Sequence, residues 1–158
     1  MDLELDVTGD FLFKIAKKIT WNQINYGYIN RFITEESIFK FNMLRLNNDS
    51  SDLEYDLSMI RHDDKRSFYK ILSDLCLYNK NIDNDIWIYI LLNLIDDKDI
   101  EWKYKFDLFE YIYCYFNTPK ELELLYYYYR AIVPLEEKID IWNKTVNNYK
   151  KIYAKYIL

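Results

Sequence analysis

The chain has 158 residues, of which 51% are hydrophobic and 30% are charged, and its formal net charge is -5. This length suits a single domain spanning 1–158, and this composition excludes an intrinsically disordered chain. The acidic charge argues against nucleic acid as a partner, because nucleic-acid-binding proteins gain much of their affinity by neutralising phosphates with basic side chains.

The first half of the chain predicts a series of short helices, since glycine and proline, with two residues each, are scarce. The first helix is predicted at 11–19, and a second begins at Trp21 with Thr20 as its N-terminal cap. Three further helix starts are predicted from capping residues: Thr34 for a helix reaching Leu46, Asp49 or Ser50 for the next, and Asp63 or Asp64 for the one after.

The middle of the chain contains one clear helix and one ambiguous segment. Residues 81–95 are apolar on nearly every side, which predicts the most buried helix of the fold. Residues 100–106 alternate between apolar and polar side chains, as a strand does, and residues 2–7 alternate in the same way. We favour a helix from Asp107 onward and leave open a small two-stranded β element near residues 2–7 and 100–106.

Two patterns organise the C-terminal part. Thr118 and Pro119 predict a helix start, with Glu121 completing a capping box. In the last helix, apolar side chains recur every three or four residues from Leu135 to Tyr156, which forms a heptad seam. This seam is expected to pack on its own domain, and pairing with a second copy is the alternative. The predicted fold class is all-α: a single-domain multi-helix bundle of about seven to eight helices.

Residue types that usually carry catalysis or bind metals are rare. The chain has one histidine, His62, and two cysteines, Cys76 and Cys114, which are predicted to be small core residues. His62 could act alone as an acid or base, but the simpler interpretation is a surface or capping histidine. We therefore predict a protein that is not an enzyme and that has no cofactor and no metal site.

The pattern of apolar residues does not predict a membrane protein. The longest apolar run, 86–92, ends well short of the ~20 residues needed to cross a bilayer. The acidic start of the chain lacks the basic segment of a signal peptide. We expect a cytoplasmic protein.

The chain is rich in aromatic side chains, with 17 tyrosines, nine phenylalanines and four tryptophans. Four consecutive tyrosines span 126–129, and four neighbours surround a helix. If Leu122, Leu125, Tyr126, Tyr129 and Ile132 face inward, Tyr127 faces solvent and Tyr128 lies on a flank. Exposed tyrosines are favoured anchors of protein interfaces, although codon bias of an AT-rich genome would also explain them.

Acidic residues are concentrated between 49 and 64, where six carboxylates face a single arginine. The simpler interpretation is a solvated helix face. The functional alternative is an acidic surface that attracts a basic protein, with Asp52, Glu54 and Asp56 as its candidate residues.

Two stretches together resemble a known family. They are 21–27 followed by 33–38, and 113–122 preceded by the apolar helix around Trp87. They resemble a family of small bacterial proteins known as a domain of unknown function, number 2247 in its series. The resemblance implies a cytoplasmic bacterial protein, and its motifs are structural, so no catalytic residue is carried over.

The leading functional hypothesis is a non-catalytic protein-binding domain of the immunity type, which neutralises a bacterial toxin. It rests on an association by type, because small, acidic, single-domain bacterial proteins often serve as immunity proteins. The expected partner is a protein, with a basic toxin as one candidate. The alternative is a homodimeric scaffold or regulatory subunit, so a monomer and a homodimer both remain open.

Overall fold

A computed structural model describes residues 5–77 and 83–157, and within these ranges every regular element is helical. The all-α prediction is confirmed. The described residues contain nine α-helices and two 3-10 segments, slightly more than expected. Backbone contacts divide them into two compact units. We call residues 5–77, 83–86 and 155–157 the N-terminal unit and residues 87–154 the C-terminal unit.

Five helices form the N-terminal unit, and each is capped by a side-chain oxygen that accepts a backbone N–H bond. They are α1 (Gly9–Ala16), α2 (Trp21–Ile29), α3 (Glu35–Arg45), α4 (Asp52–Met59) and α5 (Lys65–Cys76). The caps predicted at Thr20, Thr34 and Asp64 are confirmed. The predicted start at Asp49 or Ser50 is wrong, because Ser51 forms the capping box of α4 with Glu54.

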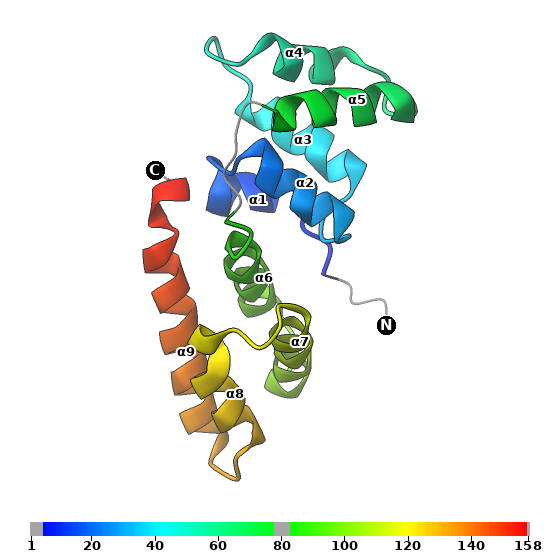
Figure 1. Ribbon diagram of the computed structural model, residues 1–158. Helices are drawn as coiled ribbons and strands as arrows, with labels where there is room; N and C mark the ends of the chain where they lie inside the picture. The colour runs from blue at the N-terminus through cyan, green and yellow to red at the C-terminus, as the bar shows by residue number, and fades with distance from the viewer. Residues whose placement is uncertain (1–4, 78–82, 158) are drawn as a thin grey trace. The chain divides into compact units, whose positions relative to one another are not determined.

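The N-terminal unit is held together by close helix packing. Helix α1 lies against α3, and α4 runs beside α5 in Figure 1. Gly9 makes the first contact possible, since a side chain there would meet the backbone of α3. The buried centre consists of apolar side chains from all five helices, including Leu12, Ile24, Phe41, Leu57 and Phe68.

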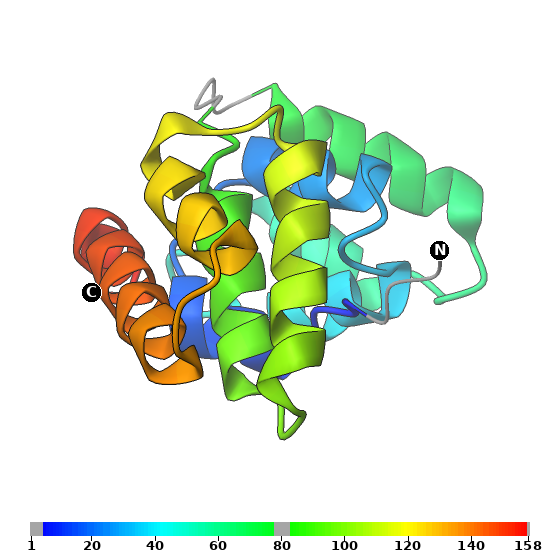
Figure 2. The same ribbon diagram turned by 90° about the horizontal axis from the view of Figure 1, so that it is seen from below.

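Four helices form the C-terminal unit: α6 (Ile86–Asp97), which belongs to it from Trp87 onward, α7 (Trp102–Tyr115), α8 (Glu123–Arg130) and α9 (Leu135–Ile152). The 3-10 segments are Lys120–Leu122 before α8 and Ala154–Tyr156 after α9. Seen from below in Figure 2, α6 lies beside α7, with α8 and α9 packed nearby. The unit centres on Trp142, whose ring meets the rings of Trp102, Phe106 and Phe109 edge-on and whose indole N–H donates to Asp96.

Helix α6 is the most apolar element, as predicted. Every described side chain from Ile86 to Leu92 is buried. The helix begins at Ile86, later than the predicted residue 81, and residues 81 and 82 lie outside the described ranges. Asp83 lies before the helix and accepts a hydrogen bond from Gln23 instead.

The alternation at 100–106 does not form a strand, so that option was wrong. Helix α7 begins at Trp102, five residues before the predicted start at Asp107. The helix allows Trp102 and Phe106 to pack on Trp142, and the Lys105 ammonium to donate to the Asp96 carbonyl at 2.8 Å. Residues 5–7 are also not in a strand, and residues 2–4 lie outside the described ranges.

The capping box predicted at Thr118 and Glu121 was also wrong. Asn117 and Thr118 have positive φ angles of 61° and 53°, and the Thr118 N–H donates to the Tyr113 carbonyl. These residues terminate α7, as left-handed residues do at helix ends. Thr118 therefore cannot adopt the extended conformation of an N-cap. The 3-10 segment that follows Pro119 separates it from α8.

Two burial expectations fail on particular residues. Ile132 was expected to face inward but is fully exposed, because α8 ends at Arg130 and the chain then becomes extended. Cys114 was expected in the core but is exposed, and Cys76 is half-buried. Leu122 and Leu125 are buried as expected.

Candidate partner-binding surface

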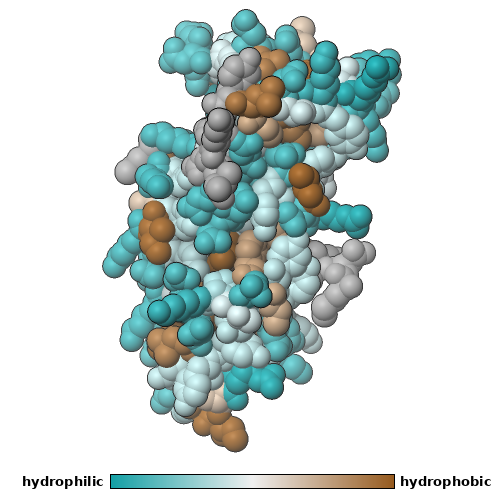
Figure 3. Space-filling view, in the orientation of Figure 1, coloured by the Kyte–Doolittle hydropathy of each residue, from teal (hydrophilic) through white to brown (hydrophobic). Residues whose placement is uncertain are grey.

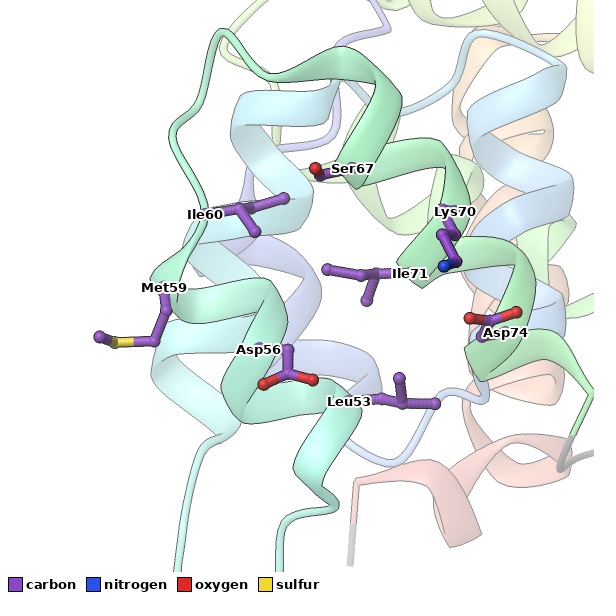
Figure 4. A pocket seen from close by; sticks show the side chains of 8 residues that line it. All are labelled: Leu53, Asp56, Met59, Ile60, Ser67, Lys70, Ile71 and Asp74. Atoms are coloured by element: carbon purple, nitrogen blue, oxygen red, sulfur yellow. The ribbon is translucent and has the colours of Figure 1, made fainter.

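A groove of about 420 Å³ separates α4 from α5 in the N-terminal unit. Leu53, Ile60 and Ile71 project into it in Figure 4, and Asp56 and Asp74 line it from opposite helices. Met59 ends α4 and is 83% exposed. In the space-filling view, hydrophobic residues lie among hydrophilic ones over the part of the molecule that contains α4 and α5 (Figure 3). We call this the α4–α5 groove.

The groove exists because α4 is a short helix that buries little of its surface. Leu57 is its only fully buried residue, and it anchors the middle of the helix. The Asn42 side-chain amide holds the N-terminal half by donating to the Glu54 carbonyl at 3.0 Å. Leu53 and Ile60 belong to the same apolar stripe as Leu57, yet they remain partly accessible and line the groove.

The three acidic residues singled out from the sequence do not share one environment. Asp52 and Asp56 are exposed, whereas the Glu54 side chain is only 19% exposed. Glu54 accepts hydrogen bonds from the Trp21 indole N–H at 3.2 Å and from the Ser51 backbone N–H at 2.9 Å. Glu54 therefore fastens α4 to α2, and the accessible charge of this helix is that of Asp52 and Asp56.

Arg45 is the basic partner behind Glu54. Its guanidinium lies 3.8 Å from the Glu54 carboxylate and packs over the rings of Trp21 and Phe41. It also donates to the backbone carbonyls of Lys17 and Ile19 after α1. Burial lowers the pKa of Arg45 to about 10, and the nearby Glu54 charge acts in the opposite direction.

The pKa of Glu54 follows from the same contacts. Burial alone would raise it, but hydrogen bonds from Ser51 and Trp21 and the charge of Arg45 bring it below its ordinary value. The Glu54 carboxylate is thus ionised and internally satisfied. It is poorly available to an outside partner, because binding one would require these bonds to break.

The carboxylates around the groove differ from Glu54 in this respect. Asp52, Asp56 and Asp74 form no ion pair with any residue that the structure describes. The groove lining contains two carboxylates, Asp56 and Asp74, and one cation, Lys70, so its net charge is one negative charge. Asp52, on the same helix as Asp56, is a further exposed carboxylate. An apolar floor with carboxylates around it suits a segment that carries both apolar and basic side chains.

Several residues of this groove were not singled out from the sequence. Ile71 lies on the apolar side of α5 with Phe68, Leu72 and Leu75; these three are buried, whereas Ile71 is half-exposed. Asp74, three residues further along α5, is the polar neighbour of Ile71 in the groove. The sequence pattern that could have indicated these two groove residues is an apolar residue followed three positions later by an acidic one, but such i, i+3 pairs are common on ordinary helices.

The candidate tyrosines belong to the C-terminal unit. Tyr127 on α8 is 66% exposed, and Tyr128 is half-buried with its ring edge-on to that of Tyr127. Leu124, one turn before Tyr127 and Tyr128, is also exposed. The remaining two tyrosines of the run stack inside the unit, Tyr126 on Tyr113 and Tyr129 on Phe106. The predicted outward direction of Tyr127 and flank position of Tyr128 agree with these exposures.

The residues weighed for catalysis and dimerisation have structural contacts. His62 is exposed and its ring stacks on Phe39, with centroids 4.1 Å apart. The seam residues from Trp142 to Tyr153 are buried within the chain, which leaves Leu135 and Ile139 as its accessible start. This is the expected packing of the seam on its own chain, and it argues against a dimer through the same face.

The described residues contain neither a cluster of metal ligands nor a membrane-spanning helix. Across 5–77 and 83–157, no three side chains of the His, Cys, Asp or Glu type converge as metal ligands would. In the same ranges, no helix combines the length and the apolar character needed to cross a bilayer.

The whole-chain comparison decides the family. The family model described as an uncharacterized protein conserved in bacteria (DUF2247) matches residues 10–156. The chain belongs to this family. The match covers both units, so the resemblance seen in two stretches of sequence extends across nearly the whole chain. Comparisons with curated proteins and with solved structures gave no match.

Proposed function

We propose that this member of the DUF2247 family is a non-catalytic cytoplasmic protein that binds a basic protein partner through the α4–α5 groove. The observation that supports the proposal is the combination of an open apolar floor with carboxylates that have no partner in the described part of the chain. In its most concrete form the protein is an immunity protein, and the partner is a cationic toxin.

Binding at the groove follows from the chemistry of its lining. An apolar side chain of the partner would displace water from Leu53, Ile60 and Ile71, which is the favourable term in most protein association. Lysine or arginine side chains flanking it would meet Asp56 and Asp74. Asp52 and Asp56 would also speed the encounter, because exposed charges raise association rates at low ionic strength. Neutralisation would then result from covering the toxin's active site or an adjacent surface.

The first test uses the partner retained by the protein from its source bacterium. Changing Asp52 and Asp56 together to lysine should slow association at least about tenfold at low salt, with a smaller effect near 0.5 M salt where charges are screened. Asp140→Lys is the matched control, since Asp140 is an exposed acid of α9. Glu54 is left intact in this variant because of its internal bonds. Association rates are measured by stopped-flow fluorescence.

The apolar floor requires a separate variant. Ile71→Lys places a cation among the groove residues and should raise the dissociation constant about a hundredfold, while Ser73→Lys on the exposed side of α5 should not. Equal binding by the wild type and both groove variants, with unchanged circular dichroism, would refute the groove as the binding site. A retained partner that is acidic would refute the charge argument.

Tyr127 offers a second contact surface for the same partner. Tyrosine is enriched among the interface residues whose truncation costs more than about 1 kcal/mol, so Tyr127→Ala should raise the dissociation constant at least about fivefold. The domain should remain folded, because the Tyr127 side chain is 66% exposed. Tyr104→Ala is the control, since Tyr104 is exposed on α7. Unchanged binding would remove Tyr127 from the interface.

A further inference from the structure

A second hollow of the N-terminal unit, about 630 Å³ in volume, lies where α2, α3 and α5 meet. Two tyrosine side chains line it, Tyr28 from α2 and Tyr69 from α5, together with Glu35 from the first turn of α3. None of these residues lines the α4–α5 groove. The volume is in the range of small-ligand sites, about 300–1,000 Å³.

The two tyrosines are fixed in position. Their rings are 6.3 Å apart and tilted by 40°, and both pack edge-on against the buried ring of Phe68. Their hydroxyl groups converge on one oxygen of Glu35: Tyr28 donates to it at 2.7 Å and Tyr69 at 3.4 Å. The site is therefore formed before any ligand arrives, which reduces the entropic cost of binding.

The charge distribution of this hollow favours a cation. The Glu35 carboxylate oxygen Oε2 has no hydrogen-bond partner among the described residues, and Glu36 contributes a second carboxylate. Arg31 also lines the hollow and forms no ion pair with a residue that the structure describes, so the lining carries one net negative charge. Burial and the bonds to Tyr69 and Glu35 raise the pKa of Tyr28, so its ring stays neutral and presents an electron-rich face.

From this geometry we propose that the pocket formed by Tyr28, Tyr69 and Glu35 binds an organic ammonium group. The cation would lie against the tyrosine rings, where the ring quadrupole attracts it, and donate to the second oxygen of Glu35. The exposed side chain of Ile29 and the buried one of Ile33 give the pocket apolar walls for the carbon chain behind the ammonium group. This goes beyond the groove interaction and does not depend on it.

The experiment measures binding of n-butylammonium to the full-length protein by NMR, with 1-butanol as the neutral probe of similar size. Butylammonium should shift the ring signals of Tyr28 and Tyr69 in a saturable way, whereas 1-butanol should not. Tyr69→Ala and Glu35→Gln should each weaken binding about fivefold, the effect of losing one cation–π contact or one screened charge. Tyr69→Phe keeps the ring and should retain binding within about twofold.

The source of the ammonium group is tested with a pentapeptide that has lysine at its centre and with the same peptide acetylated on that lysine. Tighter binding of the unmodified peptide than of butylammonium would assign the cation to a protein partner. Equal binding would assign it to a free amine. The proposal is overturned if butylammonium and 1-butanol shift the same signals equally, or if Tyr69→Ala and Glu35→Gln both bind butylammonium as the wild type does while circular dichroism shows an intact fold.

Discussion

Replacing Gly9 by alanine gives the sharpest test of how the N-terminal unit is packed. Gly9 is the first residue of α1 and is buried against α3. A Cβ atom there would lie 2.6 Å from the Ser37 carbonyl oxygen, 2.7 Å from the Phe41 nitrogen and 2.8 Å from the Lys40 Cβ. The first two atoms are backbone, so they cannot rotate away as the end of a side chain could.

The sign of the effect separates packing from helix propensity. Gly9 has no positive φ angle, so alanine is compatible with its backbone conformation. In an open helix, alanine would stabilise the protein by about 0.5–1 kcal/mol relative to glycine. The overlap with α3 requires the two helices to separate, and such overpacking costs about 1–3 kcal/mol. We therefore expect a net destabilisation of about 1–2 kcal/mol, which lowers the melting temperature by roughly 2–8 °C for a chain of this size.

Urea unfolding followed by far-UV circular dichroism and by tryptophan fluorescence measures this change. Lys14→Ala is the matched control, since Lys14 is an exposed residue of the same helix and its replacement should change stability by less than about 0.5 kcal/mol. An alanine variant as stable as the wild type, or more stable, would show that α1 does not approach α3 this closely.

Two further predictions concern charge and thiol chemistry. Glu54→Ala should destabilise the protein by about 2–4 kcal/mol at neutral pH in urea unfolding, because it removes the capping box, leaves the Trp21 N–H without its acceptor and removes the carboxylate beside the Arg45 charge. The pKa of Glu54 is lowered in the fold, so the ionised carboxylate stabilises the protein above the ordinary pKa of 4.5, and this stabilisation is lost as the pH falls below that value. The free energy of unfolding of Glu54→Gln should therefore decline less steeply than that of the wild type over the same acidic range. Cys114, which is exposed, should react with a thiol reagent before Cys76, whose pKa is raised by burial; the reverse order in mass-spectrometric mapping would contradict the described exposures.

Local chemistry explains which parts of the fold could be predicted from the sequence. Thr20, Thr34 and Asp64 cap helices where they were expected, because a capping bond joins residues only three positions apart. The apolar run after Ile86 was correctly identified as the most buried helix for a similar reason. Its composition alone requires burial on all sides.

The two errors have different physical reasons. The alternation at 100–106 satisfies a strand pattern, but Trp102 and Phe106 become helical because they pack on Trp142, 36–40 positions away. The Thr118 error is local: Thr118 has the sequence signature of a cap, yet its N–H bonds to the Tyr113 carbonyl and its φ angle is positive, so it ends the preceding helix. The same residues suit the end of one helix and the start of the next, so their types did not decide between the two.

In the candidate site, too, some features could be predicted from the sequence and others could not. Asp52 and Asp56 are exposed, as their places in an acidic run suggested. Glu54 is also acidic and lies between them in the sequence, but its carboxylate bonds to Trp21, 33 positions earlier. Composition could not separate these three acids. The separation matters for experiments, because replacing Glu54 would disturb the fold and the charge of the surface at the same time.

The size of the α4–α5 groove constrains how it would bind a protein. Fully burying one aliphatic side chain contributes about 1.5–3 kcal/mol, and Leu53, Ile60 and Ile71 are already partly buried, so covering them contributes only part of that amount each. Together these gains reach only the lower part of the cost of bringing two molecules together, which is about 4–15 kcal/mol. The groove alone would therefore support weak binding.

A tight complex, as neutralisation of a toxin requires, needs a surface nearer to about 800 Å² on this protein. The proposal thus requires contacts outside the groove. Loss of affinity in both Ile71→Lys and Tyr127→Ala would indicate that the partner contacts both units, whereas loss in Ile71→Lys alone would indicate a short docked segment with weak affinity.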